Sequence, residues 1–127
     1  RGYLNAAPSP TPSAGWRAGD LGDQARAYLD VNCAHCHRSD GPASNSGLFL
    51  TVAEAKRVAW GYRKRPVAAG RGSGGFEFDI APGDPDTSIM IHRMKSMEPG
   101  VMMPELGRSL PHAEGIRLIA EWIAGLE

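Results

Sequence analysis

Apolar residues recur at helical spacing in two segments near the ends of the chain. In residues 20–32 the positions that share one helical face are mostly apolar: Leu21, Ala25, Tyr28, Leu29 and Asn32. Asp20 can cap this helix, and Asp23 favours its first turn. In residues 111–125 the expected buried stripe is Ile116, Ile119, Trp122 and Ile123. The pattern therefore predicts an amphipathic helix at each end of a domain.

The middle of the chain predicts shorter elements. They are helices over residues 51–59 and 84–95 and a strand over residues 76–80. Thr51 and Glu54 form a capping box, and Pro85 follows Asp84 at a first helical position. Segments rich in Gly, Pro and Ser separate these elements and predict loops. We expect an all-α domain of about four helices, with room for one short β-hairpin, whose long loops need a further apolar mass to pack around.

Composition divides the chain into two parts. Residues 6–15 read AAPSPTPSAG, the composition of an extended linker, so residues 1–18 are expected to be a linker or N-terminal tail. Residues 19–127 are long enough for one domain with its own core. We therefore expect a single folded domain behind a linker.

The charge balance excludes some partners. The 14 basic and 14 acidic side chains cancel, so nothing favours nucleic acid or an anionic membrane. The run GRGSGG at residues 70–75 lacks the Lys-Ser/Thr ending of a phosphate-binding loop. No apolar run is long enough to cross a bilayer. We expect no nucleic-acid partner and no transmembrane segment.

The chemistry of the chain is concentrated in residues 33–37, which read CAHCH and contain its 2 cysteines. The pattern C-x-x-C-H is the attachment signature of c-type haem. Each thiol can add to one vinyl group of the porphyrin, which would attach Cys33 and Cys36 by thioether bonds. The adjacent His37 would then be the proximal ligand of the iron. The motif predicts one covalent haem c, with iron as the metal.

The cysteine pair allows three other interpretations. A redox-active dithiol normally lies in a βαβ unit, which the chain does not suggest. A zinc site needs a second pair of ligands, and His92 and His112 are not paired. A disulfide between Cys33 and Cys36 would close too short a loop to stabilise the fold well.

The second axial ligand of the iron decides the function, because a methionine closes the iron and raises its reduction potential. Met102 and Met103 lie in the loop VMMPELG, whereas Met90 and Met94 are expected to pack in the core. Met103 is favoured over Met102 because Pro104 restricts it to an extended conformation that can direct its side chain inward. His92 and His112 are the rival ligands, and surface or core positions are the more usual place for such histidines.

The haem propionates would need hydrogen-bond donors at a buried edge. The candidates are Trp60, Tyr62, Arg65 and Arg71, of which Trp60 and Arg65 are preferred. Each of them could equally be an exposed side chain. The run Arg63-Lys64-Arg65 could also be a solvated charge cluster, or a docking patch for an acidic partner.

With CAHCH early, an MMP loop late and helices on either side, residues 20–127 resemble the class I c-type cytochromes with a single haem. The resemblance implies the cytochrome c fold, with helices and long loops around one covalently bound haem. Ala25, Leu29 and Trp122 match the positions at which the first and last helices of that family cross. Pro42 matches the proline whose carbonyl accepts the N–H of the proximal imidazole, a bond that orients the ligand.

Residues 64–75, which read KRPVAAGRGSGG, also resemble haem domains joined to the end of larger secreted bacterial proteins. The expected function is single-electron transfer rather than an enzymatic reaction, with redox proteins or a fused dehydrogenase as partners. Because covalent haem is assembled outside the bacterial cytoplasm, the expected location is periplasmic or secreted. The alternative is a haem-based gas sensor or a peroxidase-type domain with a labile distal ligand.

Overall fold

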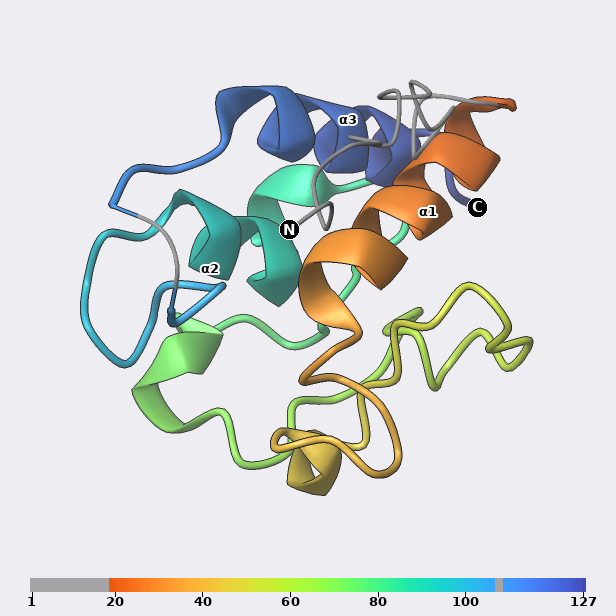
Figure 1. The fold of residues 1–127 in the computed structure, drawn as a ribbon. Coiled ribbons are helices and arrows are strands. Elements are labelled where there is room, and N and C mark those ends of the chain that lie inside the picture. The colour runs from red at the N-terminus through yellow and green to blue at the C-terminus, as the bar shows by residue number, and fades with distance from the viewer. Residues whose placement is uncertain (1–18, 107–108) are drawn as a thin grey trace, which may run out of the picture.

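The computed structural model describes residues 19–106 and 109–127, and within them the fold is helical (Figure 1). The three α-helices are α1 (Leu21–Cys33), α2 (Ile89–Lys95) and α3 (Ala113–Ala124). Short 3₁₀ turns occur at Ser44–Ser46, Gly70–Ser73 and Pro85–Thr87. The described residues contain no strand longer than an isolated bridge. The predicted all-α class is confirmed, whereas the predicted linker, residues 1–18, lies outside the described residues.

The two terminal helices pack against each other and form the core, with α3 lying across α1 in the upper half of Figure 1. Asp20 caps α1 as expected, since its Oδ1 accepts from the amide of Asp23 at 2.9 Å. The side chains with no exposed surface in this core are Ala25, Leu29, Ile80, Ile119 and Ile123. The periodic apolar stripes at both ends of the chain therefore meet face to face.

The lower half of the molecule consists mainly of loops (Figure 1). Trp60 is buried and packs on Trp122 of α3, with ring centroids 5.2 Å apart. Arg26 of α1 lies over the Trp60 ring at 5.0 Å. These contacts connect the loop region to both terminal helices.

The predicted helix over residues 51–59 is wrong, because this segment consists of turns. The Arg26 guanidinium donates hydrogen bonds to the carbonyl oxygens of Thr51 and Glu54, at 2.9 Å each. The Glu54 carboxylate, which the capping box would have turned back to Thr51, instead accepts from the amide of Lys56 at 2.8 Å. A tertiary contact thus replaces the helical hydrogen bonds.

Two further elements differ from expectation. Residues 76–80 make only isolated bridges, Phe78 with Ser88 and Ile80 with Tyr62, so the β-hairpin is absent from the described residues. The helix expected over residues 84–95 is interrupted at Ser88, which is extended and fully buried. The amide of Ile89 donates to the carbonyl of Phe78 rather than to the preceding turn. No helix among the described residues combines the length and apolarity needed to span a membrane.

Candidate functional site

A cavity of about 560 Å³ is bounded by the C-terminal end of α1, by α2, and by the segments that precede α2 and α3. Most of its lining is apolar, and the apolar side chains include Leu29, Leu48, Leu50, Ile89, Met90, Met94 and Ile116. The volume lies within the range of about 300–1,000 Å³ that is typical of ligand sites. The cavity is large enough and apolar enough for a bulky cofactor to fill it and to pack against the surrounding apolar side chains.

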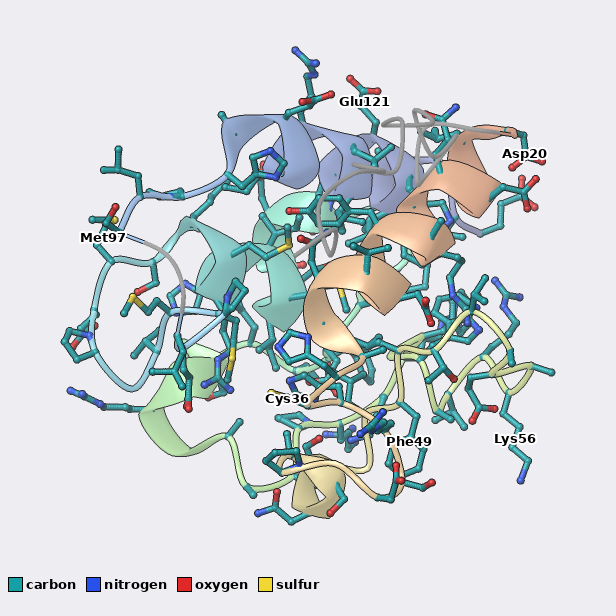
Figure 2. The ribbon with its side chains drawn as sticks, in the orientation of Figure 1. Asp20, Cys36, Phe49, Lys56, Met97 and Glu121 are labelled. Atoms are coloured by element: carbon teal, nitrogen blue, oxygen red, sulfur yellow. The ribbon has the colours of Figure 1, made fainter. Side chains whose placement is uncertain are left out.

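The CAHCH motif forms one wall of this cavity. Cys33 is the last residue of α1, and its carbonyl accepts from the amides of Cys36 at 3.2 Å and His37 at 2.9 Å. This turn brings Cys33, Cys36 and His37 into the same lining. Figure 2 shows Cys36 near the middle of the molecule, just beyond the end of α1. The local sequence therefore presents two thiols and an imidazole to one apolar space.

The two thiols are free, so the structure contains no Cys33–Cys36 disulfide. Burial, and next the charge of Cys36, raises the pKa of Cys33 to about 12. A redox-active dithiol needs the opposite shift, because the thiolate is the reactive form. The environment of Cys33 therefore does not favour the dithiol interpretation.

The imidazole of His37 is oriented by the loop that follows the motif. Its Nδ1 lies 3.4 Å from Oγ of Ser46, and it has a backbone hydrogen bond with Leu48. Burial, and next the positive charge of Arg93, lowers the pKa of His37. A neutral imidazole is the form that binds a metal. Pro42 lines the cavity, but the bond between its carbonyl and the imidazole stays a prediction.

Three methionines line the cavity: Met90 and Met94 from α2, and Met103 from the segment after it. Met90 and Met94 also belong to the buried core. Met102 is not part of the lining. The amide of Met102 donates to Glu98, whereas that of Met103 donates to the carbonyl of Arg93 at 3.0 Å. The structure thus brings Met103, rather than Met102, to the same cavity as the CAHCH motif.

Three charged residues that the sequence did not point to also line the cavity: Asp79, Arg93 and Glu105. Asp79 is buried beside Lys64, with 3.4 Å between its Oδ2 and Nζ. Burial raises the pKa of Asp79, although the Lys64 and Arg93 charges oppose the shift. Arg93 could have been found, because it lies three residues after Met90 on the same face of α2. The position of Asp79 carried no such local signal.

Trp60 and Arg65, the preferred propionate partners, do not line the cavity. Trp60 is buried between Arg26 and Trp122. Arg65 is exposed and pairs with Glu77 at 2.7 Å. Their predicted role therefore has no support in the structure and stays a prediction. Lys64 is buried against Asp79, so residues 63–65 do not form one continuous solvated charge cluster.

The remaining histidines differ in position. His35 and His112 line the cavity, whereas His92 packs edge-on against Phe76 outside it. Nδ1 of His112 lies 2.8 Å from the hydroxyl of Tyr28. This partner holds His112 at the wall between α1 and α3.

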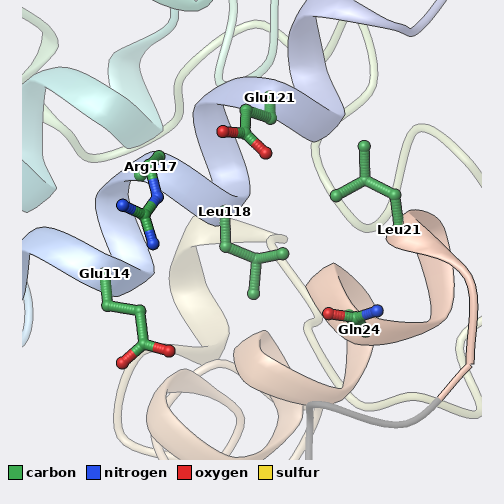
Figure 3. Close-up of a pocket in the computed structure, with 6 residues that line it drawn as sticks. All are labelled: Leu21, Gln24, Glu114, Arg117, Leu118 and Glu121. Carbon is green, nitrogen blue, oxygen red and sulfur yellow. The ribbon is translucent and has the colours of Figure 1, made fainter.

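A second, much smaller hollow of about 160 Å³ lies between α1 and α3 (Figure 3). Its lining is largely polar and includes Gln24 of α1 with Glu114, Arg117 and Glu121 of α3. In Figure 3 the charged side chains follow one face of α3, and Leu118 points towards α1. It is an ordinary polar groove between two packed helices.

Within the described part of the chain, no three His, Cys, Asp or Glu side chains come together as a metal-binding cluster. Comparison with known proteins adds no relative, since no family model, no curated protein and no solved structure matches the chain. Any assignment of function therefore depends on the residues of the cavity themselves.

Proposed function

We propose that this chain is a class I c-type cytochrome domain, which transfers single electrons through one covalently attached haem. Cys33 and Cys36 would form the two thioether bonds, and His37 and Met103 would be the axial ligands of the iron. The cytochrome c fold, wrapped around this haem, is part of the same proposal.

One observation carries the proposal. Cys33, Cys36, His37 and Met103 line a single cavity, although Met103 is 66 residues from His37 in the sequence. Haem iron takes only its axial ligands from the protein, so the absence of a three-residue metal cluster from the described residues does not conflict with this assignment.

Different residues of the cavity would bind the iron and shield the haem from water. Nδ1 of His37 is turned towards Ser46, so we assign the iron to Nε2. The apolar lining from α2, Leu48 and Leu50 would exclude water from the haem. Little solvent would then have to reorient when the iron gains or loses an electron. When bound, the haem supplies a one-electron redox couple, and methionine ligation raises its potential.

The partners follow from this role as part of the proposal. The donor would be a redox protein or a dehydrogenase fused to this domain, and the location would be the bacterial periplasm or the exterior of the cell. The alternative is a gas sensor or peroxidase-type domain, which would use the same cavity and differ in having a labile sixth ligand. Binding of CO to the reduced protein separates the two.

The first experiment tests attachment. Protein matured with the cytochrome c assembly machinery should give a pyridine haemochrome spectrum with both vinyl groups saturated. The Cys33→Ala variant should give the spectrum of a haem with one remaining vinyl group, and the Cys33→Ala/Cys36→Ala variant should lose covalent haem. A colourless wild-type protein would rule out the proposal.

The second experiment tests the ligand. The oxidised protein should show the near-infrared sulfur-to-iron band, which should vanish in Met103→Ala and persist in Met102→Ala. Met94→Ala is the matched control within the cavity, because it removes a lining methionine that the proposal leaves unligated. Loss of the band in Met94→Ala with persistence in Met103→Ala would move the ligand to α2.

A further inference from the structure

The segment that carries Met103 is bound to α2 through one residue. We call residues 98–106 the methionine loop, and we propose that Arg93 is a positioning residue that holds this loop so that the Met103 sulfur stays on the iron. The inference rests on the proposed function, and it adds a residue that neither the CxxCH motif nor the resemblance to cytochromes indicates.

Both ends of Arg93 contact the methionine loop. Its side-chain Nε donates to the carbonyl of Val101 at 2.9 Å, and its Nη2 donates to the carbonyl of Gly100 at 3.4 Å. Its own carbonyl accepts from the amide of Met103 at 3.0 Å. One residue of α2 therefore binds the loop at three points, Gly100, Val101 and the proposed ligand Met103.

A second arginine also holds the methionine loop. Arg71, in the 3₁₀ turn Gly70–Ser73, donates through Nη2 to the carbonyl of Pro99 at 2.7 Å and through Nη1 to Glu98 at 3.1 Å. Gly72 lies directly against the Arg93 guanidinium, because a Cβ at Gly72 would come within 2.9 Å of its Cζ. The turn leaves just enough space for Arg93 to reach the loop.

The setting strengthens the bond from Nε of Arg93 to the Val101 carbonyl, which is partly buried, more than the exposed bond to Gly100. Arg93 is half-buried and lines the cavity, and burial lowers its pKa while the charges of Glu105 and Asp79 oppose that shift. Hydrogen bonds from a charged donor to carbonyl oxygens contribute more than neutral ones. Removal of the guanidinium would leave the Val101 carbonyl without this donor in a buried position.

The chemical reason for such a residue is the weakness of the ligand. A thioether sulfur is a soft and weak metal ligand. When its bond to iron opens, a restrained loop keeps the sulfur nearby and favours rebinding, whereas a mobile loop does not. A loop held at Gly100, Val101 and Met103 keeps the sulfur close to the iron. A loop free at these points would let an external ligand compete for the sixth position.

The test uses the mature haem protein and compares Arg93→Ala with Arg93→Lys. In Arg93→Ala we expect a weakened near-infrared sulfur-to-iron band and about a tenfold higher affinity of the reduced protein for CO, since the two side-chain bonds together are worth roughly one decade. Arg93→Lys, which can restore one bond to a carbonyl, should be intermediate. Arg117→Ala, on the exposed face of α3, should match the wild type.

Gly72→Ala is a second variant that leaves Arg93 in place but removes the space for its guanidinium. It should reproduce the direction of the Arg93→Ala changes, and it covers the case in which Arg93→Ala fails to fold. Hydrogen exchange should accelerate across the methionine loop in both variants. An unchanged band and CO affinity in Arg93→Ala, with the haem still covalently attached, would overturn the inference alone; absence of attached haem from the wild type would overturn the proposed function instead.

Discussion

The hydroxyl of Tyr28 lies 2.8 Å from Nδ1 of His112, and the two rings are stacked with centroids 5.6 Å apart. Tyr28 belongs to α1, and His112 is the residue that precedes α3, so the pair joins the two terminal helices. Both side chains line the cavity. The contact therefore ties the packing of the core directly to the wall of the proposed haem site.

Tyr28→Phe is expected to lower the free energy of unfolding by about 1 kcal/mol, because it removes one hydrogen bond and keeps the stacked ring. Urea denaturation measures the loss. In a double-mutant cycle with His112→Ala, the two changes should be less than additive, since either one breaks the same contact. Full additivity would show that the pair contributes no coupling energy.

Gly115 is expected to be essential to the same junction. A Cβ at this position would clash with the Tyr28 hydroxyl and lie 2.7 Å from Nδ1 of His112, so Gly115→Ala must displace these side chains and break their contact. We expect a loss of about 1–3 kcal/mol in stability, the usual cost of overpacking a core. Gly125→Ala is the matched control at the other end of α3, where the nearest atom is at 3.6 Å. Equal effects of the two substitutions would contradict the steric explanation.

The buried Asp79 should make stability depend on pH in a direction opposite to that of most carboxylates. Because its pKa is raised in the folded protein, the folded state holds this proton more tightly than the unfolded chain. Its contribution is therefore complete below the ordinary value of 3.8 and is lost as pH rises through the raised pKa. The slope for one proton is at most about 1.4 kcal/mol per pH unit.

The measurement is the free energy of unfolding of the wild type minus that of Asp79→Asn, followed upwards from pH 3.8. We expect this difference to fall with pH. Glu77→Gln is the matched control, because it makes the same carboxylate-to-amide change in an exposed ion pair, that of Glu77 with Arg65. A difference for Asp79→Asn that grows with pH would mean that Lys64 and Arg93 outweigh burial at this site.

Arg26 should matter more than an ordinary helix arginine, because it bonds two loop carbonyls and covers Trp60. Arg26→Ala is expected to cost about 2 kcal/mol through the lost charged hydrogen bonds and lost packing. Arg26→Lys should recover part of the lost stability, because an ammonium group can bond one carbonyl but cannot stack on the Trp60 indole as the planar guanidinium does. A chemical denaturation series checks both values, and a neutral Arg26→Ala would show that the loop holds its position without α1.

Local patterns predicted the parts of the protein whose structure depends on neighbours in the sequence. The cap at Asp20 and the apolar stripes of α1 and α3 depend on residues three or four positions apart, and the cap and most stripe positions match the structure. Two stripe positions differ, since Leu21 is exposed and Ile116 is only half-buried. The CAHCH turn is likewise local, since the Cys33 carbonyl bonds amides three and four residues later. The helix predicted over residues 51–59 is wrong because Arg26 binds the carbonyls of Thr51 and Glu54, and Arg26 lies 25 and 28 residues earlier in the chain, outside any local window.

The order of residues alone determined the helical class, the two amphipathic helices that form the core, and the chemistry of two thiols and an imidazole within five positions. Only the tertiary structure showed that Met90, Met94 and Met103 share the cavity with that chemistry while Met102 does not, and it brought Arg93 and Asp79 to the same cavity while Trp60 and Arg65 lie outside it. The physical reason is that side-chain direction in a loop depends on long-range bonds, here those between Arg93 and residues 100–103. A periodic helix carries its orientation within its own sequence, whereas a loop receives it from the surface against which it packs.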